Sequence, residues 1–276
     1  MRAAILQMRS GIDPLLNART LVEAVERAAA GGADMLFTPE MSGLVDRDRK
    51  RAEASIVPEG EDVVLAAVRE AAAKAGIWVH LGSLAVRSEV AQAPYANRGF
   101  VIDDTGAIRA RYDKIHLFDV DLATGESWRE SAAFVPGARA VVVDTPWGRL
   151  GLSVCYDLRF PALYAALSEA GATMIAIPAA FTVPTGRAHW HILMRARAIE
   201  NAAFVIAAAQ TGLHEDGRET FGHSLAIGPW GAILLDMGEE IGLDFVDIDP
   251  SRVEEARGRV PVIAHRRPIA AAEVAR

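Results

Sequence analysis

The segment from Gly151 to Pro161 (GLSVCYDLRFP) is the feature that most constrains the fold of this chain. The apolar run from Leu150 to Val154 predicts a buried strand, which ends at Cys155, the only cysteine. Polar residues follow at once, and Pro161 then opens a stretch that fits a helix, since proline is favoured at a first helical position. We therefore expect Cys155 in a strand-to-helix turn at the carboxyl end of a strand, where open α/β sheets bind ligands. A nearby helix N-terminus would also favour a thiolate.

The rest of the chain alternates between helical and extended patterns. Apolar residues at helical spacing predict helices at 15–30, 62–75, 162–170 and 190–201. Short apolar runs predict strands at 3–8, 34–38, 77–81, 99–103, 109–112, 140–144, 150–154, 174–177, 204–208, 224–227 and 245–248, with a hairpin turn at 104–106. Because strands alternate with helices early and late but adjoin one another in the middle, we expect an α/β layered fold with mixed sheets. No linker or repeat interrupts the pattern, which predicts a single domain, and the alanine-rich end at 269–276 fits either a helix or a frayed terminus.

Charge and cysteine content exclude several classes of partner. The formal net charge of −7 gives no attraction to nucleic acid or to an acidic membrane surface. A single cysteine forms no internal disulfide, so nothing requires an oxidising compartment. The first apolar run is too short for a secretion signal, and no stretch approaches the roughly 20 apolar residues that span a bilayer. We therefore expect a cytoplasmic protein without nucleic-acid or membrane partners.

Cys155 has two interpretations. A free cysteine is usually a small buried apolar residue. A nucleophile would need help, because a thiol of ordinary pKa is only about 3% ionised at pH 7. Glu40, directly after the apolar segment MLFTP, is a candidate base whose pKa burial would raise toward neutrality, unless it simply leaves the strand into solvent. Lys114, among the apolar and aromatic residues of YDKIHLF, is a candidate to stabilise a thiolate or an oxyanion, the alternative being a surface lysine with a buried stem.

Other ionisable residues keep further possibilities open. Glu126 and Glu130 lie in a polar loop, where most glutamates are only solvated. A cysteine–histidine dyad would use His116, His189, His191 or His223. Residues 189 and 191 do not face each other on a helix, and the chain has no second cysteine and no HExxH motif, so no metal site is expected. The chain has neither GxxxxGK(S/T) nor GxGxxG, so nucleotide binding has no support from a motif.

Three segments together resemble the glutamate, lysine and cysteine motifs of the nitrilase superfamily of carbon–nitrogen hydrolases. They are TPEM (38–41), YDKIHLFD (112–119) and VCYDLRFP (154–161), in the family's order. The resemblance runs nearly end to end, through PAAF (178–181), TGRAHW (185–190), RARAIEN (195–201), GHS (222–224), PWG (229–231), VPV (260–262) and HRRP (265–268). It is nearest to the Nit branch, which includes ω-amidase and deaminated-glutathione amidase. The loop at 122–128 departs from the Pro-Gly-containing sequence usual in ω-amidases, and it borders the substrate pocket, so the departure bears on substrate identity.

The resemblance implies a four-layer αββα sandwich and a cofactor-free amidase. It implies one carbon–nitrogen hydrolase domain over residues 1–276, with 262–276 as a C-terminal tail, and a homodimer that packs through the helices at 162–170 and 190–201. By position, Cys155 is the nucleophile, Glu40 the general base, and Lys114 with the backbone N–H of Tyr156 the oxyanion donors. Glu130 matches the family's second active-site glutamate and is expected to position the substrate amide or the lysine, whereas residue 126 does not match.

The resemblance also implies a small amide substrate that carries a carboxylate, such as the amide of 2-oxoglutarate or deaminated glutathione. Arginine binds a carboxylate bidentately, and Arg159 is the first candidate for that role, ahead of Arg187 and Arg195. An internal ion pair is the alternative for Arg159, and Phe181 is a further candidate to contact the substrate. An N-carbamoyl amino-acid hydrolase, an aliphatic nitrilase, and a non-catalytic binding protein with a silent site stay open as other functions.

Overall fold

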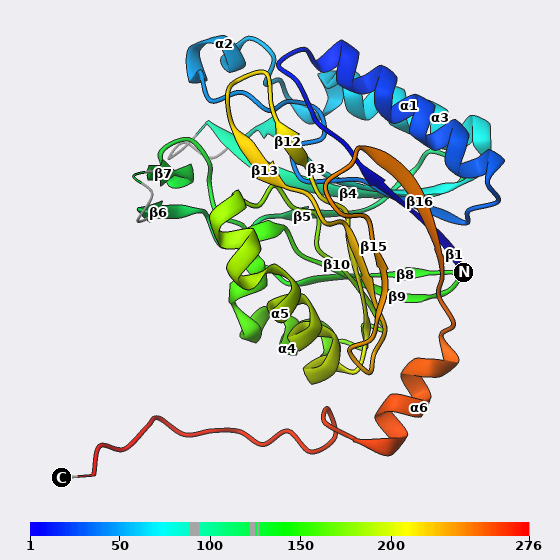
Figure 1. The fold of residues 1–276 in the computed structure, drawn as a ribbon, viewed down its shortest axis with the longest axis vertical. Helices are drawn as coiled ribbons and strands as arrows, with labels where there is room; N and C mark the ends of the chain where they lie inside the picture. Colours follow the sequence, from blue (N-terminus) through cyan, green and yellow to red (C-terminus); the bar gives the residue numbers. More distant parts are fainter. Residues whose placement is uncertain (89–93, 122–124, 126, 276) are drawn as a thin grey trace.

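Two six-stranded β-sheets lie face to face in this computed structural model, which describes residues 1–88, 94–121, 125 and 127–275 (Figure 1). In spatial order, the first sheet consists of β16 (Gly242–Asp247), β1 (Arg2–Gln7), β2 (Met35–Phe37), β3 (Trp78–Arg87), β4 (Tyr95–Ile102) and β5 (Ile108–Asp113). The second consists of β15 (Ile233–Asp236), β14 (Leu225–Ile227), β11 (Phe204–Ala207), β10 (Met174–Ala176), β9 (Gly148–Leu152) and β8 (Val141–Thr145). Both sheets combine parallel and antiparallel pairs, as the sequence predicted.

Helices cover the two outer faces. The longer ones are α1 (Pro14–Ala30), α3 (Val63–Ala75), α4 (Pro161–Glu169), α5 (Val183–Asn201) and α6 (Ser251–Arg259), and α2 (Arg49–Glu53) is a short one. Helices α1 and α3 pack side by side on the first sheet, and α4 and α5 lie on the far side of the second (Figure 1). Small hairpins β6 (Asp119–Asp121) with β7 (Ser127–Arg129) and β12 (Thr211–Leu213) with β13 (Glu219–Phe221), and 3-10 turns η1 (Glu59–Glu61), η2 (Glu130–Ala132) and η3 (Cys155–Arg159), complete the described elements. The arrangement is the expected αββα sandwich.

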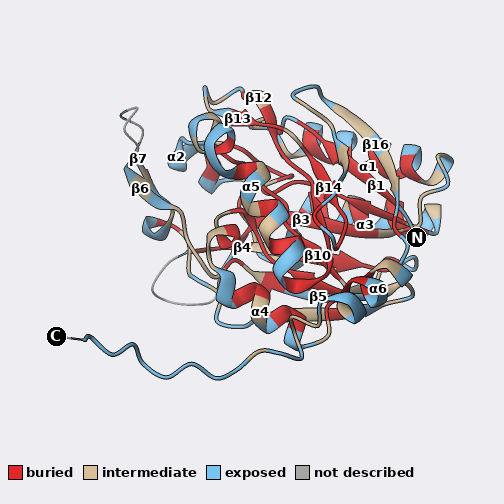
Figure 2. Cartoon of the chain, turned by 60° about the horizontal axis from the view of Figure 1, so that its bottom comes forward, coloured by how far each residue is buried: buried red, intermediate tan, exposed pale blue. Residues whose placement is uncertain are grey.

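Strand β1 shows why the first sheet is buried on both of its faces. Its side chains alternate in direction: Ala3 and Ile5 join the core between the sheets, whereas Ala4 and Leu6 join the core under α1 and α3. A strand buried on both faces needs a continuous apolar run rather than an alternating one. Figure 2 shows the result as a buried interior that runs through both sheets, with exposed residues on the outer helices.

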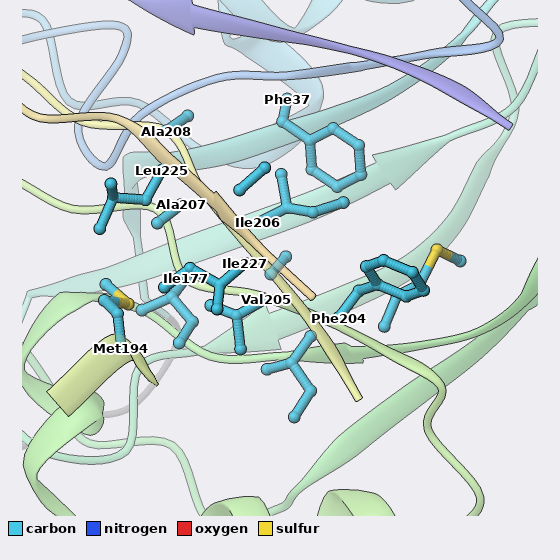
Figure 3. Close-up of a cluster of buried hydrophobic side chains, with 14 of the residues drawn as sticks. Phe37, Ile177, Met194, Phe204, Val205, Ile206, Ala207, Ala208, Leu225 and Ile227 are labelled. Carbon is cyan, nitrogen blue, oxygen red and sulfur yellow. The ribbon is translucent and has the colours of Figure 1, made fainter. Parts of the chain in front are cut away.

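The core between the sheets is closely packed. Phe37 of β2 points from the first sheet toward Phe204 and Ile206 of β11, and all three are at most 1% exposed (Figure 3). Burying a side chain of this size stabilises the folded state by about 1.5–3 kcal/mol. The two sheets are therefore held in a fixed relation, which matters because the residues of the site come from both of them.

Some helices begin and end where the sequence predicted, and others do not. Asp62 caps α3 by accepting from the N–H groups of Val64 and Leu65, and Gly76 ends that helix in the left-handed conformation. The prediction of a helix at 190–201 was too short, because α5 begins at Val183, where the proline in its first turn needs no N–H partner. Helix α6 was not predicted.

Strand β3 is also longer than predicted. The apolar run suggested an end at Leu81, yet the strand continues through Gly82 and Ser83 to Arg87, with a register shift between Leu81 and Leu84. The small polar pair Gly82 and Ser83, where the apolar run ends, is therefore a β-bulge inside the strand.

Among the described residues, no helix is long and apolar enough to cross a membrane. The described part of the alanine-rich end, 269–275, is exposed and forms no helix.

Candidate active site

Cys155 lies where the sequence placed it, in the turn between β9 and α4. Its backbone has a φ of 50°, a left-handed conformation that a non-glycine residue adopts only when its surroundings hold it there. Its N–H donates to the carbonyl of Pro178 at 2.9 Å, and the buried Asp157 accepts from the N–H of Val154 at 2.9 Å. These bonds fix the turn, and the thiol is only 7% exposed.

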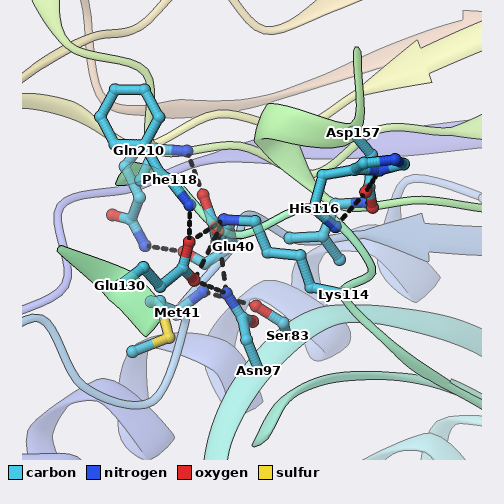
Figure 4. Close-up of polar contacts among 12 residues, drawn as sticks. Glu40, Met41, Ser83, Asn97, Lys114, His116, Phe118, Glu130, Asp157 and Gln210 are labelled. Carbon is cyan, nitrogen blue, oxygen red and sulfur yellow. Dashed lines mark hydrogen bonds and ion pairs between the residues drawn. The ribbon is translucent and has the colours of Figure 1, made fainter. Parts of the chain in front are cut away.

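Glu40 does not leave its strand into solvent. It follows β2, is 4% exposed, and is hydrogen-bonded to the Cys155 thiol. Its Oε1 accepts from Lys114 Nζ at 2.9 Å, and its Oε2 accepts from the N–H of Ala180 at 2.9 Å (Figure 4). The backbone carbonyl of Glu40 accepts from Gln210 Nε2 at 3.0 Å. The carboxylate is thus held by groups of both sheets while it touches the sulfur.

Lys114 lies between two carboxylates. It follows β5, is 2% exposed, and its Nζ lies 2.9 Å from Glu40 Oε1 and 2.8 Å from Glu130 Oε2 (Figure 4). Glu130 Oε2 also accepts from the N–H of Phe118 at 2.7 Å, so its position is fixed from the backbone. The expectation that Glu130 positions the lysine agrees with these contacts, whereas residue 126 lies outside the described residues.

Asn97 is a member of the site that sequence reasoning missed. Its Nδ2 donates to Glu40 Oε1 at 2.9 Å and to Glu130 Oε1 at 3.2 Å, so one amide orients both carboxylates (Figure 4). Its Oδ1 is buried and has no hydrogen-bond partner among the described residues. The available signal was a buried-type strand, YANRGFVI, that carries an amide where an apolar residue would be ordinary.

The charges of the site differ in two respects from the expectation. Burial alone would raise the pKa of Glu40, but Lys114, the Cys155 thiol and Asn97 together hold that pKa below its ordinary value. The expected rise toward neutrality was therefore wrong, because a paired cation and several hydrogen bonds together outweigh desolvation. Burial and the neighbouring Glu40 charge raise the pKa of the Cys155 thiol, against the expectation of a favoured thiolate. Burial lowers and both glutamates raise the pKa of Lys114, and the glutamates prevail.

No histidine contacts the thiol among the described hydrogen bonds. His116 Nδ1 lies 2.7 Å from Asp157 Oδ1 (Figure 4), and His189 Nδ1 lies 3.2 Å from Arg159. His191 and His223 each contact Asp236 at 2.9 Å, and the three possible ligand atoms lie within 4.8 Å of one another. None of these groups lines the cavity above the thiol, so the geometry favours Glu40 over a histidine as the base.

A cavity of about 760 Å³ opens above Cys155 between the described residues. Glu40, Lys114, Tyr156 and Phe181 line it, as expected for the nucleophile's surroundings and for the candidate substrate contact. Arg159 does not line it: the guanidinium lies 5.9 Å from the Tyr156 ring centre and 5.4 Å from that of Phe181. Arg159 therefore lies behind the rings of Tyr156 and Phe181, which form part of the cavity wall.

The other two predicted arginines are also outside the wall. Arg195 donates to the carbonyl of Gly231 at 2.9 Å, and Arg187 does not line the cavity. The positively charged side chains that line the cavity besides Lys114 are instead Arg47, Arg49, Arg129 and Arg218. Sequence reasoning did not select them, because they lie in loops, a short helix and the end of a hairpin, where no pattern marks what a side chain faces.

A buried cysteine paired with a glutamate and a lysine in an αββα sandwich defines a class of enzyme. The carbon–nitrogen hydrolase family model matches residues 2–258, and the chain belongs to that family, within the nitrilase superfamily. It is an amidase of this superfamily, acting on C–N bonds.

Particular relatives cover most of the chain. It is 38% identical to the deaminated glutathione amidase of Yersinia enterocolitica over 96% of this chain and 92% of that protein. It is 39% identical to the nitrilase and fragile histidine triad fusion protein NitFhit of Caenorhabditis elegans, over 96% of this chain. It spans 60% of the length of that fusion protein, whose crystal structure matches with a TM-score of 0.88, covering 65% of the crystallised chain.

A solved amidase from Nesterenkonia sp. AN1 is similar as well. It is 28% identical, with a TM-score of 0.80 over 97% of this chain and 94% of that one. That structure is of a glutamate-to-glutamine mutant and shows covalent addition of the acetamide moiety of fluoroacetamide at the active-site cysteine of that protein.

Proposed function

We propose that this chain hydrolyses a carboxylate-bearing amide of the deaminated-glutathione class through a thioester on Cys155. The observation that carries the proposal is that Glu40 contacts both the thiol and Lys114 at the closed end of an open cavity. A base, a nucleophile and a cation within hydrogen-bond reach of one another are the arrangement that covalent amide hydrolysis needs.

In the first step, Glu40 takes the thiol proton as the sulfur attacks the amide carbon. The low pKa of Glu40 keeps it ionised at neutral pH, and the raised pKa of the thiol keeps the proton in place until attack. The amide oxygen becomes an oxyanion beside Lys114 and the backbone N–H of Tyr156. That N–H lies in the first turn of η3, where helical donors have no intrahelical acceptor.

The second step breaks the C–N bond. Glu40, now protonated, gives its proton to the departing nitrogen, which leaves as ammonia from a primary amide or as an amine from a substituted one. The acyl group remains on Cys155 as a thioester. Water then attacks the thioester carbon and gives its proton to Glu40, which returns it to the thiolate as the acid leaves. Glu130 and Asn97 take no proton; they hold Lys114 and Glu40 in position.

Two observations support a substrate larger than the amide of 2-oxoglutarate. The deaminated glutathione amidases among the relatives share 38% of their residues with this chain over nearly its whole length. The cavity of about 760 Å³ lies in the upper part of the range of roughly 300–1,000 Å³ that drug-sized ligands occupy. A tripeptide-sized amide fits this volume better than a five-carbon one.

Brief exposure to the amide, followed by intact mass measurement, tests the proposal. We expect the wild-type chain to gain the mass of the acyl group, and Cys155→Ala to gain none and to release no ammonia or amine. Hydrolysis that persists in Cys155→Ala would overturn the covalent route. Release of acid from a nitrile without a free amide, or of carbon dioxide from an N-carbamoyl amino acid, would assign the site to one of the other two reactions.

We also propose that the chain forms a homodimer through the outer face of α5. Ile192 and Ile199 of this helix are 71% and 49% exposed, and Trp230, in the turn that packs against Ile199, is 57% exposed. An exposed apolar group of this kind is ordinarily covered by a partner. Light scattering should give twice the chain mass, and Ile192→Glu should give the monomer; a monomeric wild type would contradict the proposal.

A further inference from the structure

Four arginine side chains line the cavity besides Lys114: Arg47, Arg49, Arg129 and Arg218. Arg47 precedes α2, and Arg218 lies between β12 and β13, so two distant segments bring their guanidinium groups to one cavity. The chain as a whole carries a net charge of −7, which makes a local excess of cations unexpected. Arg129 is neutralised by Asp121 at 2.8 Å, but Arg47 has no ion pair among the described residues.

Arg218 is poorly satisfied where it lies. Its side chain is 18% exposed, its Nε is buried without a hydrogen-bond partner, and its one ion pair, with Asp216, is long at 3.3 Å. Asp216 is occupied elsewhere, because Oδ2 accepts from the N–H of Arg47 at 2.8 Å and Oδ1 accepts from the N–H of Arg218 at 2.9 Å. Burial and the nearby Arg47 charge hold the pKa of Arg218 below its ordinary value, although Asp216, Glu40 and Asp46 raise it. A largely buried guanidinium whose Nε–H has no partner favours an anionic ligand.

Trp128 connects the two arginines. The Arg218 guanidinium carbon lies 4.8 Å from its ring centre and that of Arg47 lies 5.9 Å from the same ring. Trp128 itself lines the cavity, and its Nε1–H is buried without an acceptor among the described residues. Two guanidinium groups that repel each other and one indole N–H without an acceptor thus meet at one part of the wall. A carboxylate placed there would interact favourably with all three.

We propose that Arg218 and Arg47, which both lie over the Trp128 ring, bind the carboxylate at the non-reacting end of the amide substrate. The inference rests on the proposed function and adds a recognition site to it. Because Cys155 and these residues line one cavity, one substrate molecule can place its amide carbon at the thiol and its carboxylate at Arg218. The site therefore selects for amides that carry a second, negatively charged group.

Nearby acidic groups do not remove this preference. Asp46 lines the cavity but is held by Arg51 in a two-point pair at 2.6 and 2.7 Å. Glu219 also lines it and is exposed to solvent, which screens its charge. Arg49 adds a further positive charge to the wall, although one of its Nη groups donates to the carbonyl of Arg129 at 2.8 Å.

The experiment compares two substrates that differ only at the remote end. One is a peptide-like amide with a free terminal carboxylate, and the other is its neutral carboxamide. The quantity measured is the ratio of their kcat/KM values in wild type, Arg218→Met, Arg47→Met and Arg218→Lys. Arg19→Met, an exposed arginine on α1, is the matched control.

We expect wild type to prefer the carboxylate, and each methionine variant to lose about tenfold to hundredfold of that preference, mainly through KM. Arg218→Lys should recover part of it, and Arg19→Met should keep it all. Arg47 is exposed, so Arg47→Met tests the inference even if Arg218→Met fails to fold.

The opposite results separate two failures. Equal kcat/KM for both substrates in wild type, with thioester formation intact, would overturn the carboxylate site while leaving the amidase proposal standing. A preference that survives both methionine variants would do the same. An absence of thioester with either substrate would instead contradict the proposed function itself.

Discussion

Replacing Lys114 by methionine is the perturbation that distinguishes this site most sharply from other arrangements. Lys114 Nζ contacts Glu40 at 2.9 Å and Glu130 at 2.8 Å, and Asn97 bridges the same two carboxylates from one amide nitrogen. Methionine keeps the length and apolar stem of the side chain but removes the charge. Two buried carboxylates then share a small volume without a cation.

The magnitude has two parts. Loss of one oxyanion donor costs about 2.7–4 kcal/mol of transition-state stabilisation, or a factor of roughly 10²–10³ in kcat. The carboxylate pair also repels, so one of the two takes up a proton, and the pKa of Glu40 rises from below its ordinary value to above it. Breaking a buried pair costs about 3–5 kcal/mol of folding stability, so the variant must first be shown to be folded.

The pH profile carries the test. In wild type, Glu40 stays ionised well below pH 5, so kcat/KM should be flat from about pH 5.5 to 8. In Lys114→Met the base becomes protonated as pH falls, so activity should decline with falling pH inside that interval. Release of ammonia or amine between pH 4 and 9 measures both curves, with Lys74→Met as control, since that lysine side chain is 78% exposed.

A uniform loss at every pH would refute the reasoning, since it would mean that Lys114 does not set the ionisation of the base. A wild-type profile that falls near pH 6.5 would do so too, since it would indicate a histidine base.

Three other changes test separate parts of the structure. Asn97→Leu should lower kcat about tenfold or more with little change in KM, measured by steady-state kinetics, because both carboxylates lose a donor. Gly82→Ala should cost about 1–3 kcal/mol in denaturant unfolding and also lower activity, since its Cβ would lie 2.1 Å from the carbonyl oxygen of Thr38, two residues before Glu40; Gly60→Ala, with free space around it, should be neutral. Burial lowers the pKa of His80 to about 3, so the unfolded state alone binds its proton between about pH 6.5 and 3, and stability should fall by roughly 2 kcal/mol from pH 7 to pH 5. His80→Leu should reduce that slope, and an unchanged slope would assign it to other groups.

The sequence carried enough information for the order of layers and the place of Cys155. Apolar runs such as that of β1 are long enough to identify, and the polar residues after Val154 mark the turn at Cys155. Glu40 was selected because it directly follows an apolar strand, and Lys114 because it is a charge among apolar and aromatic residues; the structure brings both to the thiol.

What the sequence did not disclose depends on contacts between distant segments. Asn97 contacts Glu40 across 57 positions, and an amide in a strand has no periodicity to mark it. The pKa direction of Glu40 was missed for the same reason, since it depends on the cation placed beside it rather than on burial alone. The arginines of the cavity wall belong to loops and a short helix, where residue type gives little indication of what a side chain faces.

The residues to which we assign the chemistry come from two different sheets. Glu40 follows strand β2 of the first sheet. Its carboxylate accepts a hydrogen bond from the N–H of Ala180, and its backbone carbonyl accepts one from Gln210. Both of these partners lie in segments that follow strands of the second sheet. Cys155 also follows the second sheet, and Lys114 follows the first. In the proposed mechanism, turnover thus reports on the alignment of the two layers: a slip of one against the other by about 1 Å would cost roughly 10²-fold in rate while both layers were still intact.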